Sequence, residues 1–466
     1  MKKALLIGLV VGILAAWSIP AMAIDWSGSG YINVMYAAAR NGAVPGNNPF
    51  AANNAYLDEM SSWMFMRGRL LIKAQASPDL YGVFYFEMDS NFWGEGTTTR
   101  AGGSGFMGRW GADAVAVEIK HCYVDFRMPP NLPLWFRIGV QDVSLASKVL
   151  LSNDGAAVTA TLKVEPIKMN VMFRYAKPAD SDEFTAADGT EIYQFAVDMP
   201  LGPVTPQVYF MYNNVRYGAN NLVAGNLDYE QLWWLGLNLK GKIGMGSVTI
   251  RPELDLVWSD GTGTVSGGND VNYGSWLTRF DLAALINKLT VGMQAYYCMG
   301  RDWDDFTADN RDSTFQRPRP NSSGLAGMTS IHNVWRAGGY FMSSGGVGGP
   351  MTGNLPATYL VGAWWLGAYV EYQIFDWLKV GGAVSYIGDT EEDGDAIDRL
   401  SQNNGDADDD QSIGWEFCFG TEVKLYKNLS WNTAFGYLFA HKGLSLNGGV
   451  TPDDPWAFRS ALMYRF

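Results

Sequence analysis

The sequence predicts an all-β protein, a transmembrane antiparallel β-barrel of about 18 strands with short periplasmic turns and long extracellular loops. Three observations support this class. Apolar and polar residues alternate along many segments, short turns alternate with long polar loops, and no apolar run beyond the N-terminal region approaches the ~20 residues of a spanning helix. Aromatic residues make up 14% of the chain and charged residues only 17%, a balance typical of strand-rich barrels.

The first residues predict export. Residues 1–3 form a positive segment, residues 4–17 are largely apolar, and residues 21–23 (Ala-Met-Ala) fit the small-x-small cleavage rule. We therefore expect a cleaved signal peptide over 1–23 and a barrel over 24–466. A first transmembrane helix is the alternative, but the apolar run is short and is followed by a proline and the cleavage motif.

Charge and cysteine usage exclude several classes of protein. The formal net charge is −13, and losing Lys2 and Lys3 with the signal makes it −15 (−13 − 2), which argues against nucleic acid as a partner. An odd number of cysteines leaves no complete disulfide framework, and scattered histidines without His-x-x-x-His or Cys-x-x-Cys spacing predict no metal and no cofactor. These residues are Cys122, Cys298, Cys418, His121, His332 and His441, of which His121 is expected to face the interior.

The first predicted hairpin shows the alternation clearly. A strand from Ser27 to Ala38 and a loop from Arg40 to about Ser61 precede it. Over 64–75 the even positions are mostly apolar, a short turn at 77–80 reverses the chain, and the return strand is again apolar at even positions. One face therefore suits lipid and the other water. The polar face carries Arg67, Arg69, Lys73, Tyr85, Glu87 and Asp89.

The same pattern continues along the chain. Short turns end at Leu80, Leu132, Leu289, Leu378 and Leu429, and others lie near Pro166, 200–203 and 241–246. Longer Gly/Asn/Asp-rich connections cover about 40–61, 94–113, 143–153, 178–188, 215–227, 259–271, 301–357, 390–412 and 443–453. This count favours 18 strands, with 16 or 20 if one hairpin is miscounted, and barrels of about 16 to 18 strands enclose an aqueous channel.

The closing segment, 456–466, has aromatic and apolar residues at its even positions and both of its arginines at odd ones. It ends on Phe466 and is expected to pair with the first strand, which would leave no unpaired edge in lipid. This ending resembles the terminal strand of bacterial outer-membrane porins, whose final Phe resembles an assembly signal. Signal, hairpins and closing strand together resemble the trimeric general porins of Gram-negative bacteria over nearly the whole chain. The resemblance implies a homotrimer in the bacterial outer membrane, in contact with lipid and lipopolysaccharide.

Charges on the interior faces suggest what the barrel does. Arg69 is expected opposite Glu87 or Asp89, depending on register, and Asp125 opposite Arg137. These pairs either neutralise each other in place or, with Arg459, form a basic wall that concentrates and orients solutes. The candidate pore-lining residues are Arg67, Arg69, Lys73, Glu87, Asp89, Asp125, Arg127, Arg137, Asp142, Lys148, Asp154 and Arg459.

Two loops are candidates for narrowing the pore. The strand that ends at Asp142 is similar to the one before the inward-folded third loop of porins, which by that resemblance makes 143–153 the constriction loop, although it is short for this role. The arginine- and glycine-rich loop 301–357 is the alternative. A third loop, 389–411, is strongly acidic; we expect a solvated loop rather than a Ca²⁺ site, because the EF-hand spacing fails.

These features favour a non-enzymatic pore for passive diffusion of small hydrophilic solutes and ions. A substrate-specific porin is the alternative, because Trp233-Trp234 and Trp364-Trp365 would each turn one ring inward, where stacked aromatics can guide sugars. Interfacial girdles are the simpler interpretation of most tryptophans. A barrel enzyme is disfavoured by isolated histidines and the lack of a Gly-x-Ser-x-Gly elbow, and a receptor or adhesin that uses the long loops stays open.

Overall fold

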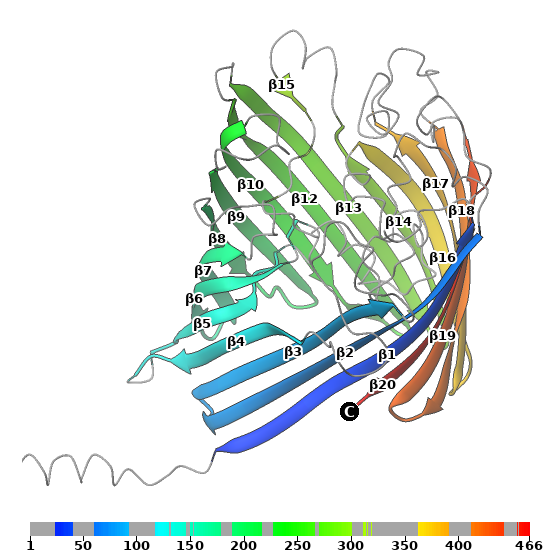
Figure 1. Ribbon diagram of the computed structural model, residues 1–466, viewed down its shortest axis with the longest axis horizontal. Helices are drawn as coiled ribbons and strands as arrows, with labels where there is room; N and C mark the ends of the chain where they lie inside the picture. Colours follow the sequence, from blue (N-terminus) through cyan, green and yellow to red (C-terminus); the bar gives the residue numbers. More distant parts are fainter. Residues whose placement is uncertain are drawn as a thin grey trace, which may run out of the picture.

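The structure is a computed structural model (Figure 1). It describes residues 24–40, 60–92, 117–129, 132–145, 150–151, 153–178, 189–216, 227–265, 270–300, 311–313, 315, 318, 362–390, 412–441, 454 and 456–466. Among these residues no helix is long and apolar enough to cross a membrane.

All described strands belong to one sheet. The first half of the chain forms β1 (Asp25–Arg40), β2 (Met60–Ser77), β3 (Leu80–Phe92), β4 (Glu118–Arg127), β5 (Leu134–Asp142), β6 (Asp154–Val164), β7 (Met169–Pro178), β8 (Thr190–Asp198), β9 (Val204–Arg216) and β10 (Leu227–Gly241). The second half forms β11 (Ile243–Met245), β12 (Val248–Val265), β13 (Val271–Ile286), β14 (Leu289–Cys298), β15 (Arg311–Asp312), β16 (Ala363–Phe375), β17 (Leu378–Asp389), β18 (Ser412–Tyr426), β19 (Leu429–Ala440) and β20 (Trp456–Arg465).

The sheet closes on itself, as the closing segment predicts. β20 pairs antiparallel with β1, and the backbone N–H and C=O of Phe466 bond the C=O and N–H of Gly30. Two strands add nothing to the wall: β11 continues the pairing of β10 with β12, and the two-residue β15 lies parallel to β13. Eighteen antiparallel strands remain in the described part of the chain, so the predicted all-β, 18-stranded barrel is confirmed.

The short connections lie at one end of the barrel. The start of β1 and the end of β20 lie at the same end. Asp25 is in register with Gln75, beside the turn at 78–79, and the N–H of Arg465 bonds the carbonyl of Asn428 in another turn. Asn287 takes a positive φ of 53° in a two-residue turn, a conformation that asparagine tolerates. The predicted loop at 259–271 is shorter than expected, because β12 continues to Val265 by pairing with β10 and β13.

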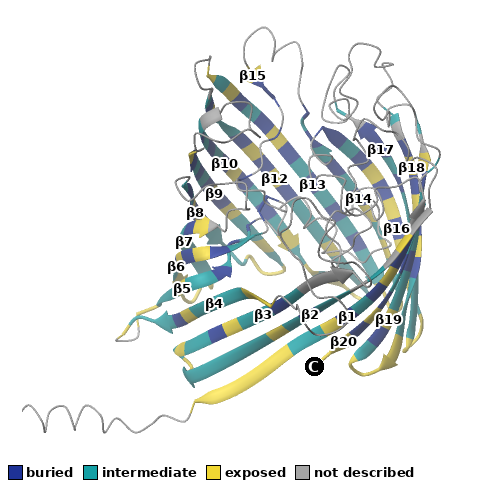
Figure 2. Cartoon of the chain, viewed as in Figure 1, coloured by how far each residue is buried: buried dark blue, intermediate teal, exposed yellow. Residues whose placement is uncertain are grey.

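An apolar surface surrounds the barrel. Alternate residues along the strands are exposed and hydrophobic, and buried or half-buried positions fall between them (Figure 2). Leaving so much apolar area in water would be costly, so the surface suits hydrocarbon. Exposed outward residues come from every wall strand except β17, for example Ile32, Leu70, Phe84, Val124, Ile138, Val158, Phe173, Phe195, Phe210, Leu235, Leu256, Trp276, Met293, Leu366, Phe417, Trp431 and Leu462.

Candidate functional site: the inner wall of the barrel

The densest group of charges on the inner wall spans β2, β3, β4 and the start of β6. Glu87 is opposite Arg69, which settles the register left open by the sequence in favour of Glu87. The Glu87 carboxylate accepts from Arg69 Nε at 2.7 Å, lies 3.3 Å from Arg67 Nε and 2.9 Å from Lys120 Nζ. Lys120 Nζ also lies 2.7 Å from Asp154 Oδ2, and His121 Nε2 lies 2.7 Å from Asp154 Oδ1. We call these six residues the ionic cluster.

Lys120 is the member of this cluster that sequence reasoning missed. Strict alternation would place it on the lipid face, because its neighbour His121 faces inward. The register shifts at this point, with Tyr85 opposite His121 and Phe86 opposite Ile119, so Lys120 is the extra residue of a β-bulge. A lysine on the lipid face of a barrel costs about 2–4 kcal/mol at mid-depth. The lipid-facing position that strict alternation gives Lys120 therefore indicated a β-bulge.

A second charged group lies nearer the short turns. Asp125 is opposite Arg137, as expected, and its Oδ2 accepts from Arg137 Nε at 2.9 Å. The Arg137 guanidinium also lies 4.4 Å from the centre of the Tyr123 ring, a cation–π distance. Lys73 Nζ lies 4.2 Å from the centre of the Tyr81 ring. Aromatic rings thus accompany the cations along this wall.

The other candidate residues occupy different places. Arg127 Nε donates to the carbonyl of Leu132 at 2.9 Å, so Arg127 lies at the short-turn rim. Arg459 faces inward on β20 but is only 5% exposed, and its register partners are Ala37 and Ala434. Lys148 and the side chain of Asp89 lie outside the described residues.

The described residues of the connection between β5 and β6, 143–145, 150–151 and 153, lie inside the barrel. This connection is the predicted constriction loop. Its two arms pair through Val143 N–H to Asn153 C=O at 2.9 Å and Leu145 N–H to Leu151 C=O at 3.1 Å. Asp142 accepts at the base of the first arm from the Ser144 N–H at 2.8 Å and from the Ser144 hydroxyl. The apolar side chains of both arms are buried in a cluster with inner-face residues of β6 to β10. The arms contribute Val143, Leu145, Leu150 and Leu151.

This apolar cluster continues around the wall opposite the ionic cluster. Trp234 and Trp365 turn their rings inward, as expected, but they are 0% and 5% exposed. Tyr296 stacks on Trp365 with ring centres 4.0 Å apart. Phe315, from the predicted alternative loop 301–357, also belongs to the cluster, whereas most of that loop lies outside the described residues. Covered rings of this kind offer no open face on which a sugar could stack.

Several carboxylates on the opposite wall are buried. Arg279 Nε donates to Asp255 Oδ2 at 2.9 Å, and its Nη2 lies 2.5 Å from Glu253 Oε1. Asp281 accepts from the Tyr369 hydroxyl at 3.0 Å and from a side-chain amide, both of which are neutral donors. Solvent-accessible charge occurs on both walls: in the ionic cluster Asp154 is 27% exposed and Arg69 23%, and on β17 and β18 the ion pair of Lys379 and Glu422 is 20% and 26% exposed.

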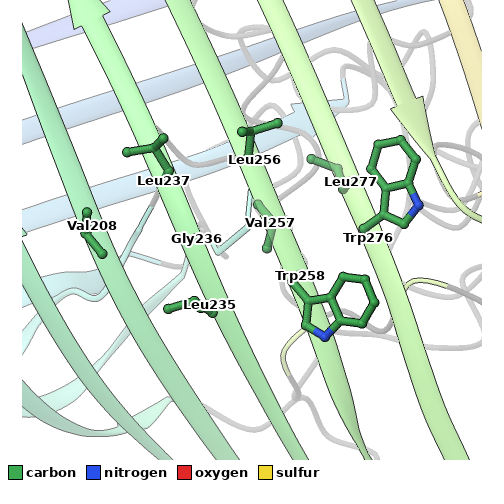
Figure 3. A pocket seen from close by; sticks show the side chains of 9 residues that line it. All are labelled: Val208, Leu235, Gly236, Leu237, Leu256, Val257, Trp258, Trp276 and Leu277. Carbon is green, nitrogen blue, oxygen red and sulfur yellow. The ribbon is translucent and has the colours of Figure 1, made fainter.

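A hollow of about 540 Å³ lies on the outer face of the barrel, not on the inner one (Figure 3). It runs across β9, β10, β12 and β13, and its walls include the outward side chains Leu235, Leu237, Leu256, Trp258 and Trp276. Because its lining is apolar, this hollow belongs to the lipid-facing surface and forms no part of a path for hydrophilic solutes.

No group of three or more metal-ligating side chains occurs in the described part of the chain. The acidic loop lies outside the described residues over 391–411, as does His332. His441 Nδ1 lies 2.5 Å from the Ser412 hydroxyl. None of the described cysteines forms a disulfide, and Cys298 and Cys418 are buried.

Comparisons with known proteins agree on the fold. No family model and no curated protein sequence matches the chain. Solved structures do: OccK11 (OpdR) of Pseudomonas aeruginosa has a TM-score of 0.54 at 10% identity, with 95% of this chain and 96% of that chain covered. A BenF-like porin from Pseudomonas fluorescens has a TM-score of 0.55 at 10% identity, covering 95% and 98%. OpdK of Pseudomonas aeruginosa, solved with vanillate, has a TM-score of 0.53 at 9% identity, covering 94% and 98%.

The expected resemblance to porins is thus confirmed at the level of the fold. The structures that it matches are Pseudomonas channels such as the BenF-like porin, and the alignment extends over nearly the whole of both chains. The chain is an 18-stranded antiparallel barrel that shares its fold with these porins.

Proposed function

We propose that the protein is an outer-membrane porin, a water-filled channel for passive diffusion of small hydrophilic solutes and ions. The observation that carries the proposal is the opposition of the two faces: the outer face is apolar and exposed, whereas the inner face holds partly exposed arginines, lysines and carboxylates. Charges inside a closed barrel need water, and a lumen supplies it.

The route along the inner wall follows from which part of the wall apolar side chains cover. The ionic cluster and the Asp125–Arg137 pair retain solvent contact, while the opposite wall is covered at the level of Trp234, Trp365 and Tyr296. We therefore infer that solutes pass along β2 to β6, where the predicted pore-lining residues Arg67, Arg69 and Glu87 lie. Focused charge on one side of a narrow channel orients dipoles and concentrates counter-ions.

A substrate-specific channel is the second candidate. Arg69 lies 5.7 Å from the ring centre of Tyr31 and 6.0 Å from that of Tyr85, and Arg137 lies against Tyr123. Guanidinium groups beside accessible aromatic faces suit a solute that combines a carboxylate with a ring. One neighbour of similar fold was solved with vanillate, which belongs to that class.

The remaining expectations belong to the proposal as well. Residues 1–23 act as the cleaved signal, the mature barrel of 24–466 resides in the bacterial outer membrane among lipid and lipopolysaccharide, and it assembles as a homotrimer. Support for export and assembly comes from the sequence of the two ends, and support for the homotrimer from the resemblance to general porins alone. The protein is not an enzyme in this proposal and uses no cofactor.

Planar-bilayer recording of the purified protein across a KCl gradient tests the proposal. The expected result is long-lived, ohmic conductance with a stable reversal potential, and in steps of three if the homotrimer is right. A saturable current that vanillate blocks, with no block by glucose, would identify the substrate-specific candidate. The same protein unfolded by heat serves as the control. Insertion into the bilayer without conductance would refute a channel of either kind.

A further inference from the structure

A row of buried polar side chains crosses the inner wall from β5 to β8. Thr159 Oγ1 donates to Gln141 Oε1 at 2.8 Å, Arg174 Nε donates to Thr159 Oγ1 at 2.9 Å, and Arg174 Nη1 donates to Gln194 Oε1 at 2.8 Å. All four residues are at most 9% exposed. The row ends on the inward connection, because Gln194 Nε2 donates to the carbonyl oxygen of Val143 at 2.9 Å.

The direction of these hydrogen bonds is fixed by Arg174. A guanidinium only donates, so it requires the oxygen of the Gln194 amide, and the amide nitrogen must then point toward Val143. Gln194 is 1% exposed, and a missing partner for its N–H group would leave a buried donor unsatisfied. The carbonyl of Val143 is therefore the group that completes the row.

The hydrogen bond to Val143 fixes the base of the inward connection to the wall. The N–H groups of Val143 and Leu145 on the first arm donate to the carbonyls of Asn153 and Leu151 on the second, so a contact to Val143 bears on both arms. Gln194 lies on β8, three strands away from the β5 end of the connection. The amide of Gln194 thus adds a directional contact to the apolar packing that already holds the arms against the wall.

Burying this row costs free energy, because its charged and polar groups lose their contacts with water. Arg174 is a buried cation, and both hydrogen-bond partners described for its guanidinium, Thr159 and Gln194, are neutral. Packed apolar side chains would close the same wall without the desolvation of a charge. We propose that Arg174 and Gln194 are positioning residues that hold the described base of the inward connection, residues 143–145, 150–151 and 153, at a fixed depth in the lumen and so help to set the open cross-section of the pore. This inference rests on the proposed porin function.

The variant Gln194→Glu separates the two roles of this side chain. A glutamate carboxylate still accepts from Arg174, and the adjacent guanidinium favours its ionised form. It has no proton to donate to Val143, so the tie to the loop is lost while the buried cation keeps its partner. Ser259→Ala is the matched control: Ser259 is a buried inner-face residue of β12 that donates to the Ser275 carbonyl at 3.3 Å, away from the loop.

Single-channel recording in 1 M KCl, where the screening length is about 3 Å, minimises the effect of the added charge. We expect Gln194→Glu to raise the conductance about 1.5- to 2-fold and to increase open-channel noise, since conductance of a water-filled pore follows its open cross-section. Each variant loses one hydrogen bond, so both should unfold at a similar temperature slightly below that of the wild type. Ser259→Ala should leave conductance and noise unchanged.

The outcomes distinguish failure of the positioning role from failure of the proposed function. Wild-type protein that forms no channel refutes the proposed function. Wild-type channels together with a Gln194→Glu variant of unchanged conductance and noise refute the positioning role and leave the porin intact. A Gln194→Glu variant that only unfolds at lower temperature, with wild-type conductance, assigns the row to stability of the barrel and likewise overturns the inference.

Discussion

Replacing Glu87 by glutamine tests whether the ionic cluster faces the path of the ions. Glu87 is 2% exposed and meets three cations, Arg67, Arg69 and Lys120, of which Lys120 also reaches Asp154. Arg67, Arg69 and Lys120 thus surround one carboxylate. Glu87→Gln makes the charge of the cluster more positive by one unit without changing the shape of the side chain.

The expected shift in selectivity follows from Coulomb's law. One added unit charge acts on an ion about 10 Å away in water with about 0.4 kcal/mol. At 0.01 M salt, where the screening length is about 30 Å, about 0.3 kcal/mol remains. The free energy of an anion falls and that of a cation rises by this amount, so the anion-to-cation permeability ratio should increase about threefold.

The assay is the reversal potential in a bilayer across a dilute KCl gradient. Asp376→Asn is the matched control, because it makes the same change of charge at an exposed short turn between β16 and β17. A shift toward anions in Glu87→Gln that exceeds the control supports a cluster that faces the ion path. Equal reversal potentials in the two variants would refute that placement. Gel mobility of unheated and heated samples shows that both barrels are folded.

Three further predictions concern the same wall and the outer face. Lys120→Met removes a cation from the ionic cluster, so the reversal potential should shift toward cations, opposite to Glu87→Gln; a shift toward anions would contradict this. Asp125→Asn removes a carboxylate that is 9% exposed from its ion pair with Arg137, which is 35% exposed, and should lower the free energy of unfolding in urea by about 1 kcal/mol, whereas no loss would mean that the pair adds nothing to stability. Leu235→Arg puts a charge on the lipid face and should cost about 2–4 kcal/mol of folding free energy in lipid vesicles, while Thr161→Arg on the inner face should cost little; equal costs would contradict the assignment of faces.

Alternation of side chains was enough to predict the barrel, because each strand has one face in lipid and one in water. It placed Arg69 and Glu87 on the inner face, and it put Asp125 opposite Arg137. It left the partner of Arg69 open, since register depends on bulges that alternation does not encode. The structure has such shifts between Met66 and Gly68 and between Gln75 and Ser77.

Other features depend on contacts between distant parts of the chain. The inward orientation of Trp234 follows from its position, but its burial comes from the apolar cluster that it shares with Val143 and Leu150. Arg459 was expected to join Arg67 and Arg69, yet it pairs in register with Ala37, whereas Arg67 is in register with Asn33, four residues along β1. The sequence pattern does not predict the polar row to Gln194, because its members are uncharged apart from Arg174 and lie on four strands.

The central claim, a water-filled lumen lined by the charged faces of the strands, is tested most directly by two adjacent residues. In a background with the three native cysteines replaced by alanine, Arg69→Cys places a thiol on the inner face and Leu70→Cys places one on the lipid face. A charged, membrane-impermeant thiol reagent added during bilayer recording should lower the current through Arg69→Cys and leave Leu70→Cys unchanged, because the reactive thiolate forms only in water. Modification of Leu70→Cys with no effect on Arg69→Cys would contradict the account.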